Sequence, residues 1–132
     1  MQNPYEKYKQ QSILTMTGGD LVNLLFETAI QRLNQGILAM QNKDYAGANT
    51  ALLKAQNIFA HLSVTLDGQY EVAGQLEALY DFFNYSIRQA NMRKDPGPVE
   101  EILPMVAELK ETFAQADKNV RMQRTGSSLN VN

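Results

Sequence analysis

The sequence predicts an all-α protein: an antiparallel up-down-up-down four-helix bundle with an N-terminal arm and a disordered C-terminal tail. Apolar residues recur at steps of three and four in four separate segments, which is the spacing of one face of an α-helix. Helices of about 20 residues joined by short breaks favour antiparallel neighbours. We expect the arm at residues 1–16, the bundle at 17–120 and the tail at 121–132.

Composition limits the protein to one domain and removes several classes of partner. The chain has 132 residues and a net charge of -2, which gives no electrostatic basis for binding nucleic acid or an anionic membrane surface. It has no cysteine, which suits a reducing cytosol. The polar N-terminus lacks a signal-peptide pattern, and no apolar run approaches the roughly 18 residues of a membrane span. We therefore expect a cytoplasmic protein without membrane insertion.

The first segments combine an apolar arm with a capped helix. Residues 1–16 place Tyr5, Tyr8, Ile13 and Leu14 among polar residues, and we expect them to dock on the bundle because these side chains are costly to leave in water; a frayed terminus is the alternative. Thr17 is a candidate N-cap for the first helix. We expect Asn42 to end that helix in the left-handed conformation. The apolar stripe between them is Val22, Phe26, Ala29, Leu33, Ile37 and Met40.

The second helix has a regular apolar stripe between two polar turns. Asp44 is a candidate N-cap, and Asp67-Gly68-Gln69 is a turn into the third helix. The alternation of three and four is strict. The stripe is Tyr45, Ala48, Leu52, Ala55, Phe59, Leu62 and Leu66.

The third helix has more apolar surface than one packed stripe requires. Val72, Leu79 and Phe82 lie about 60 to 100° around the helix from its stripe, so we expect this surplus surface to have a partner. Gly74 costs about 1 kcal/mol relative to alanine, and we expect a close helix approach there. The stripe itself is Ala73, Leu76, Tyr80, Phe83, Ile87 and Ala90.

The fourth helix follows a break with two prolines at residues 94–98, and Pro98 suits its first turn. Pro104 falls inside the apolar pattern, so we expect either a kink there or a start nearer Leu103. From Arg121 onward the sequence lacks period and apolar mass. The stripe is Val99, Ile102, Val106, Leu109, Phe113, Ala116 and Val120.

We predict no catalytic residue, cofactor or metal. His61 is the only histidine and shares a polar helix face with Asn57 and Lys54. A histidine phosphotransfer bundle is the sharper alternative, but Val64 and Thr65 stand where such domains usually have lysine and glycine. Carboxylate pairs such as that at residues 108 and 111 lack the Glu-x-x-His pattern of a di-iron site and are interpreted as surface charge.

Short motifs in a fixed order along residues 3–117 point to a family. They are Asn3-Pro4-Tyr5 with Tyr8, residues 12–17, residues 21–26, residues 54–58, Leu79-Tyr80-Asp81-Phe82, and Ala90-Asn91 with Asp95. This succession resembles the flagellar secretion chaperones of the FliS family, which bind flagellin. The chain departs from the family pattern at Gly18, Phe26 and Phe113, where proline, tyrosine and tryptophan are frequent.

The resemblance implies a cytosolic, non-enzymatic chaperone. It would bind the disordered C-terminal segment of flagellin, block premature polymerisation and help to deliver the subunit to the export gate. Flagellin's terminal segment forms amphipathic helices, and the surplus apolar surface can take their stripe. We expect client contacts at Ile58, Leu79, Phe82 and Leu103, for which ordinary core packing is the alternative.

The resemblance also implies a role for the arm, which would cover part of the site in the free protein through Tyr5, Tyr8 and Ile13. The competing class is a structural or signalling bundle. It includes the phosphotransfer module and a homodimer whose surplus apolar surface is its own interface.

Overall fold

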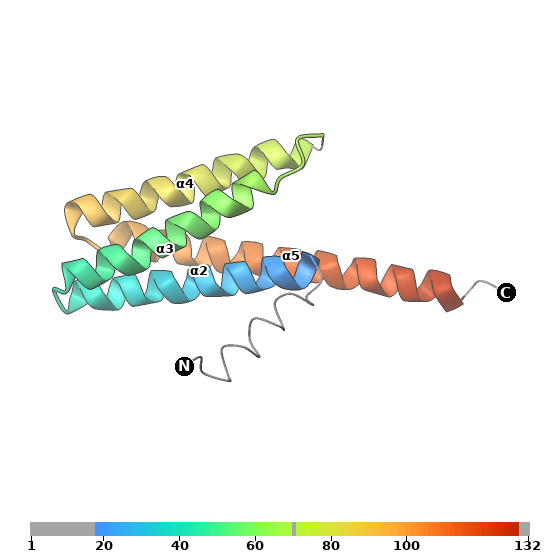
Figure 1. Cartoon of the computed structure of the whole chain (residues 1–132), viewed down its shortest axis with the longest axis horizontal. Coiled ribbons are helices and arrows are strands. Elements are labelled where there is room, and N and C mark those ends of the chain that lie inside the picture. The colour runs from blue at the N-terminus through green and yellow to red at the C-terminus, as the bar shows by residue number, and fades with distance from the viewer. Residues whose placement is uncertain (1–17, 70, 130–132) are drawn as a thin grey trace, which may run out of the picture.

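The computed structural model describes residues 18–69 and 71–129, with side chains described to residue 123. These residues form α2 (Gly18–Gln41), α3 (Tyr45–Val64), α4 (Glu71–Arg93) and α5 (Gly97–Leu129). The helices alternate in direction, each packs against the next, and α5 returns along α2 (Figure 1). The predicted all-α bundle is confirmed. The arm residues Tyr5, Tyr8 and Ile13 and the Thr17 cap lie outside the described residues.

The predicted apolar stripes meet in one core, except near the C-terminal part of the α5 stripe, where Ala116 and Val120 are exposed. Aromatic rings from α2, α3 and α4 pack at its centre. Phe59 stacks on Tyr80 with ring centroids 6.2 Å apart and lies tilted against Phe83 at 5.2 Å. Phe26 of α2 lies tilted 6.3 Å from Tyr80 between ring centroids. Burial raises the pKa of Tyr80 to about 12. Tyr45, the first residue of the predicted α3 stripe, is instead exposed at the helix end, where Lys94 Nζ lies 5.0 Å from its ring centroid.

The connection from α2 to α3 confirms one prediction and corrects another. The Gly47 N–H donates to Asp44 Oδ1 at 3.0 Å, so Asp44 caps α3 as predicted. The left-handed residue is Lys43, with φ 60°, and the prediction of Asn42 is wrong. The Asp44 N–H reaches back to the Ala39 carbonyl at 2.8 Å, and that closing bond places the left-handed residue immediately before Asp44.

The close approach between helices occurs at a different glycine from the one predicted. Gly36 is buried in α2, and a methyl group added there would meet Leu52 Cδ2 at 2.6 Å. Gly74 is exposed, and a methyl group there would meet nothing within 4 Å, so the prediction of a close approach at Gly74 is wrong. Gly74 follows the buried Ala73, and one residue turns the helix by about 100°, which directs Gly74 away from the core.

The last helix is longer than predicted. It begins at Gly97, where the backbone N–H donates to Asp95 Oδ1 at 3.0 Å, and it includes Pro104 in its interior; a start nearer Leu103 is wrong. Its backbone remains helical to Leu129, past the expected boundary at residue 120. Figure 1 shows α5 continuing past the N-terminal start of α2. No described helix is both long enough and apolar enough to cross a membrane.

Candidate binding surfaces

The α4–α5 side of the bundle is the most open. These two helices make the least extensive contact among the four neighbouring pairs, and α4 diverges from α5 along the molecule (Figure 1). Three consecutive pockets follow this side, and together we call them the α4–α5 groove. Phe82, Tyr85, Ser86, Gln89, Arg93, Pro98 and Glu101 line an end pocket of about 250 Å³. Leu79, Met105, Glu108, Leu109 and Thr112 line a middle pocket of about 270 Å³.

The groove continues along α5 beyond the middle pocket. An outer pocket of about 470 Å³ shares Glu108 and Thr112 with the middle pocket and reaches Asn119. Leu79 and Phe82 are one helical turn apart, so the end and middle pockets are also adjacent. From Pro98 to Asn119 the groove extends about 30 Å along the helix axis.

The floor of the groove is apolar because α4 has more large apolar residues than the core can hold. Phe83 is fully buried, whereas the adjacent Phe82 is 42% exposed and lies with its ring centroid 6.4 Å from that of Phe83. Consecutive residues point about 100° apart on a helix, so only one of the two rings can enter the core. Met105 adds a side chain that is 37% exposed from the facing helix.

Carboxylates occupy the α5 side of the groove. Glu101 lines the end pocket, Glu108 lines the middle and outer pockets, and Glu111 lines the outer pocket. Arg93, in the end pocket, is the one basic residue that lines these three pockets in the described part of the chain. The groove therefore combines an apolar floor in its end and middle pockets with an acidic rim on α5, and Ala116 is the one apolar residue among the described residues that line the outer pocket.

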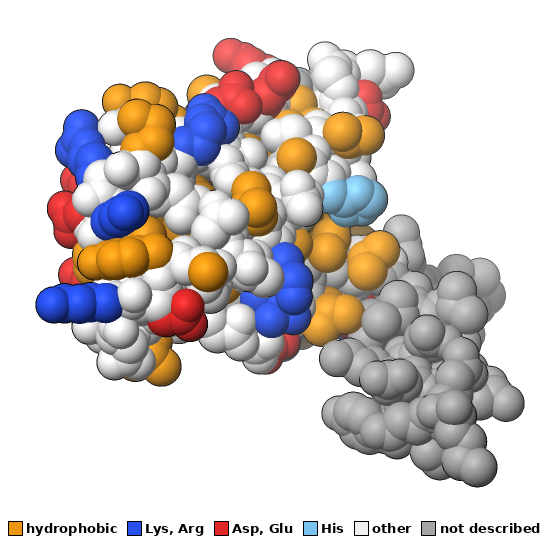
Figure 2. Space-filling view, turned by 60° about the vertical axis from the view of Figure 1, so that its left-hand side comes forward, with side chains coloured by type: hydrophobic (Ala, Val, Ile, Leu, Met, Phe, Trp, Pro, Cys, Tyr) orange, Lys and Arg blue, Asp and Glu red, His pale blue; other side chains and the backbone are white. Residues whose placement is uncertain are grey.

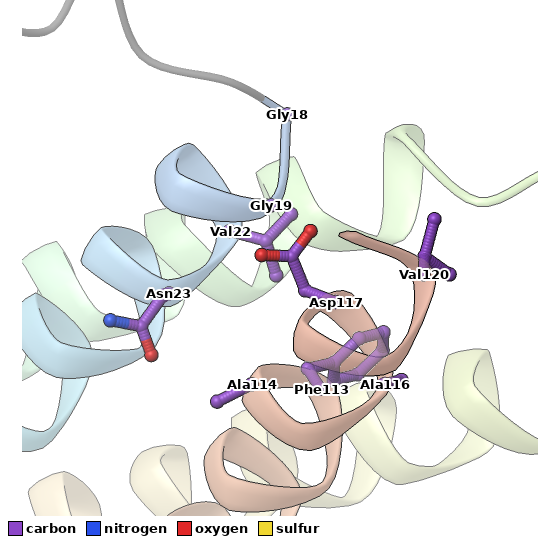
Figure 3. A pocket seen from close by; sticks show the side chains of 9 residues that line it. All are labelled: Gly18, Gly19, Val22, Asn23, Phe113, Ala114, Ala116, Asp117 and Val120. Atoms are coloured by element: carbon purple, nitrogen blue, oxygen red, sulfur yellow. The ribbon is translucent and has the colours of Figure 1, made fainter. Parts of the chain in front are cut away.

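A second pocket of about 240 Å³ lies between the start of α2 and the second half of α5, and it shares Ala116 with the outer pocket of the groove (Figure 3). Phe113 forms one wall, and its ring stacks on that of Phe26 with centroids 5.4 Å apart. The Asp117 carboxylate lies against Gly19, where a methyl group would collide with it. Arg121 joins the same helix ends, since its guanidinium is 3.1 Å from Asp117 Oδ2 and 2.8 Å from Asp20 Oδ1.

The departures from the family pattern fall at this second pocket. Gly18 and Phe113 line it, and Phe26 supports the ring of Phe113. Gly18 is also the second residue after the arm in the sequence. The pocket is thus directly adjacent to the start of the described chain.

The structure places two of the four predicted client residues in one groove. Leu79 and Phe82 line adjacent pockets of the α4–α5 groove. Ile58 and Leu103 are half-buried, pack against the core and line none of the pockets described above. Sequence reasoning did not select Met105, although its position one turn before Leu109 places both on the same side of α5.

The rest of the described surface gives less support for a functional site than these pockets do. His61 is exposed on α3 and lines none of these pockets. Hydrophobic side chains on the face shown in Figure 2 lie in separate patches between charged ones. Within the described residues, no three or more histidine, cysteine, aspartate or glutamate side chains are grouped so that they could hold a metal ion.

The fold and the groove define a helical-bundle protein with an elongated groove along α5. A family model described as "Flagellar protein FliS" matches residues 1–120. The chain therefore belongs to the FliS family of flagellar secretion chaperones, which is a chaperone family and not an enzyme family. The resemblance noted from the sequence motifs is confirmed.

Individual relatives agree with this assignment. The chain is 33% identical over 127 residues to the flagellar secretion chaperone FliS of Bacillus subtilis (strain 168), covering 96% of each protein. It is 29% identical over 121 residues to the flagellar secretion chaperone FliS of Vibrio cholerae serotype O1, covering 87% of this chain and 89% of the relative. A crystal structure described as a flagellar chaperone from bacteria superposes with a TM-score of 0.72 at 18% identity, over 87% of this chain and 95% of the other, which supports the fold.

Proposed function

We propose that this chain is a cytosolic export chaperone that binds the disordered C-terminal segment of flagellin. It prevents premature polymerisation of flagellin and assists its delivery to the export gate of the flagellar type III apparatus. Family membership supports the general role in flagellar secretion. The α4–α5 groove is the observation that supports client binding.

The groove suits an amphipathic helical segment in length and chemistry. Its length of about 30 Å corresponds to about 20 helical residues. Leu79, Phe82 and Met105 provide apolar contacts for residues spaced by one turn on the client. Ile58 and Leu103 are proposed as further contacts, which a client would reach only at their exposed edges because both pack against the core.

Moderate affinity follows from the energetics of such a complex. A segment that wraps the bundle can bury about 2,000 Å² in total, and the apolar part of that area gives a gross gain of tens of kcal/mol at about 25 cal/mol per Å². Ordering a disordered segment and immobilising both partners removes most of this gain. Moderate affinity suits a chaperone that must release its client for export.

The arm is proposed to compete with the client. Tyr5, Tyr8 and Ile13 would cover part of the binding surface in the free protein and leave when the client binds. The α2–α5 pocket begins at Gly18, two residues after the arm, and shares Ala116 with the outer pocket of the groove, which supports docking of the arm at the border of the client surface. Replacing Tyr8 with alanine should change flagellin affinity with little change in the unfolding midpoint; unchanged affinity would remove the arm from the mechanism.

Sedimentation velocity with and without a flagellin C-terminal peptide tests the proposed function. We expect the full chain and the peptide to form a complex, and a scrambled peptide of the same composition to form none. A chain that self-associates to a homodimer and does not bind the peptide would contradict the proposal and favour a structural role.

A further inference from the structure

The acidic rim of the α4–α5 groove lies on one helix. Glu101, Glu108 and Glu111 are all exposed on α5 and separated by seven and three residues, so they lie on the same side of that helix. The facing wall from α4 consists of apolar and uncharged polar residues until Arg93 at its end. In the end and middle pockets a segment would therefore meet α4 on one flank and the carboxylates of α5 on the other, whereas the described residues that line the outer pocket all come from α5.

The rim glutamates are not ion-paired within the described part of the chain. Arg93 nevertheless shares the end pocket with Glu101. Lys110 stands between Glu108 and Glu111 in sequence, but neighbouring residues point about 100° apart on a helix, and Lys110 lines none of the three groove pockets.

We propose that the α4–α5 groove selects client segments that carry lysine or arginine beside their apolar stripe. This inference rests on the proposed function and specifies the chemistry of the client. An apolar floor gives affinity to any amphipathic segment, whereas charges on the rim determine which segment is accepted. Basic flanks complement Glu108 and Glu111, and acidic flanks are repelled by them.

Two synthetic amphipathic peptides of about 20 residues test this selection. Both carry the same apolar stripe, and one has lysine and the other glutamate at the flanking positions. We expect the lysine peptide to bind the full chain about tenfold more tightly in about 50 mM salt, because each exposed charge pair contributes a factor of a few. The preference should shrink in about 0.5 M salt.

A pair of charge-reversal variants separates the rim from net charge. The Glu108→Lys/Glu111→Lys variant and the control Glu27→Lys/Glu77→Lys each replace two exposed glutamates with lysines, so both undergo the same change in net charge. Glu27 and Glu77 line none of the three groove pockets. We expect the preference for the lysine peptide to be lost in the rim variant and kept in the control. Circular dichroism establishes that both variants are folded.

Three results would overturn the inference. The first is that neither synthetic peptide binds the wild-type chain, and the second is that both charge-reversal variants lose the preference for the lysine peptide equally. The third is that a flagellin C-terminal peptide binds the wild-type chain and the rim variant with equal affinity. The third result would leave the proposed function intact. Failure of the flagellin peptide to bind, together with a rim-dependent preference for the lysine peptide, would reject flagellin as the client while supporting the charge selection.

Discussion

The neighbouring residues Phe82 and Phe83 offer a direct separation of binding from stability. Phe83 is fully buried, with its ring 5.2 Å from that of Phe59, whereas Phe82 is 42% exposed in the groove. Replacing Phe82 with alanine removes surface that a client would cover, and replacing Phe83 with leucine perturbs the core. The two variants change the same residue type one position apart on the same helix.

The expected magnitudes follow from the exposed area. A phenylalanine side chain has an accessible area of about 200 Å², so the 42% left exposed at Phe82 is roughly 80 Å². Covering that area with a client contributes about 2 kcal/mol, which corresponds to about thirtyfold in Kd. By the same conversion, the roughly 120 Å² of Phe82 that is already buried in the free protein contributes up to about 3 kcal/mol to folding, so Phe82→Ala also lowers stability. Phe83→Leu should lower the free energy of unfolding by about 1 to 2 kcal/mol and serves as the control that loses stability alone.

Isothermal titration calorimetry with a flagellin C-terminal peptide measures the first quantity, and denaturant unfolding measures the second. We expect Phe82→Ala to weaken binding about thirtyfold and Phe83→Leu to lower stability with a much smaller effect on Kd. A folded Phe82→Ala variant with wild-type affinity would refute the assignment of the groove as the client site.

Three further predictions concern the fold. Gly36→Ala should lower the unfolding midpoint, because crowding against the facing helix costs about 1 to 3 kcal/mol. Gly74→Ala should raise stability by up to about 1 kcal/mol. A thermal scan that shows the opposite order would contradict the packing described. Burial raises the pKa of Tyr80 to about 12. The contribution of the neutral, buried phenol to stability is therefore complete below a pH of about 10 and is lost as pH rises toward 12. Tyr80→Phe should reduce this alkaline loss of stability in denaturant titrations. Asp44→Ala should cost about 1 kcal/mol through loss of the α3 cap, measured by denaturant unfolding, and an unchanged midpoint would show that the cap is dispensable.

The sequence predicts the core well because the buried residues of a helix recur with a regular period, which is visible in a single sequence. The stripe of α4 is buried at Tyr80, Phe83 and Ile87, and the surplus residues Val72 and Phe82 remain 54% and 42% exposed. The order of residues alone indicates that surplus, because six stripe positions already fill one face of the helix.

The position of the groove does not follow from helical periodicity. It depends on which helices are neighbours and on how far they diverge, and the apolar stripe of one helix predicts neither. Met105 lies beside the α5 stripe, and its exposure in the groove results from the limited contact between α4 and α5. The exposure of Gly74, in contrast, does follow from periodicity, because Gly74 stands one residue after the stripe residue Ala73, whereas Gly36 stands three residues after the stripe residue Leu33.

Nuclear magnetic resonance on the isotope-labelled chain, titrated with unlabelled flagellin C-terminal peptide, tests the central claim most directly. The groove account predicts that backbone amide shifts concentrate at Leu79, Phe82, Met105 and Leu109. Saturating peptide that leaves these amides unchanged, and instead moves resonances on the outer face of α2, would contradict it.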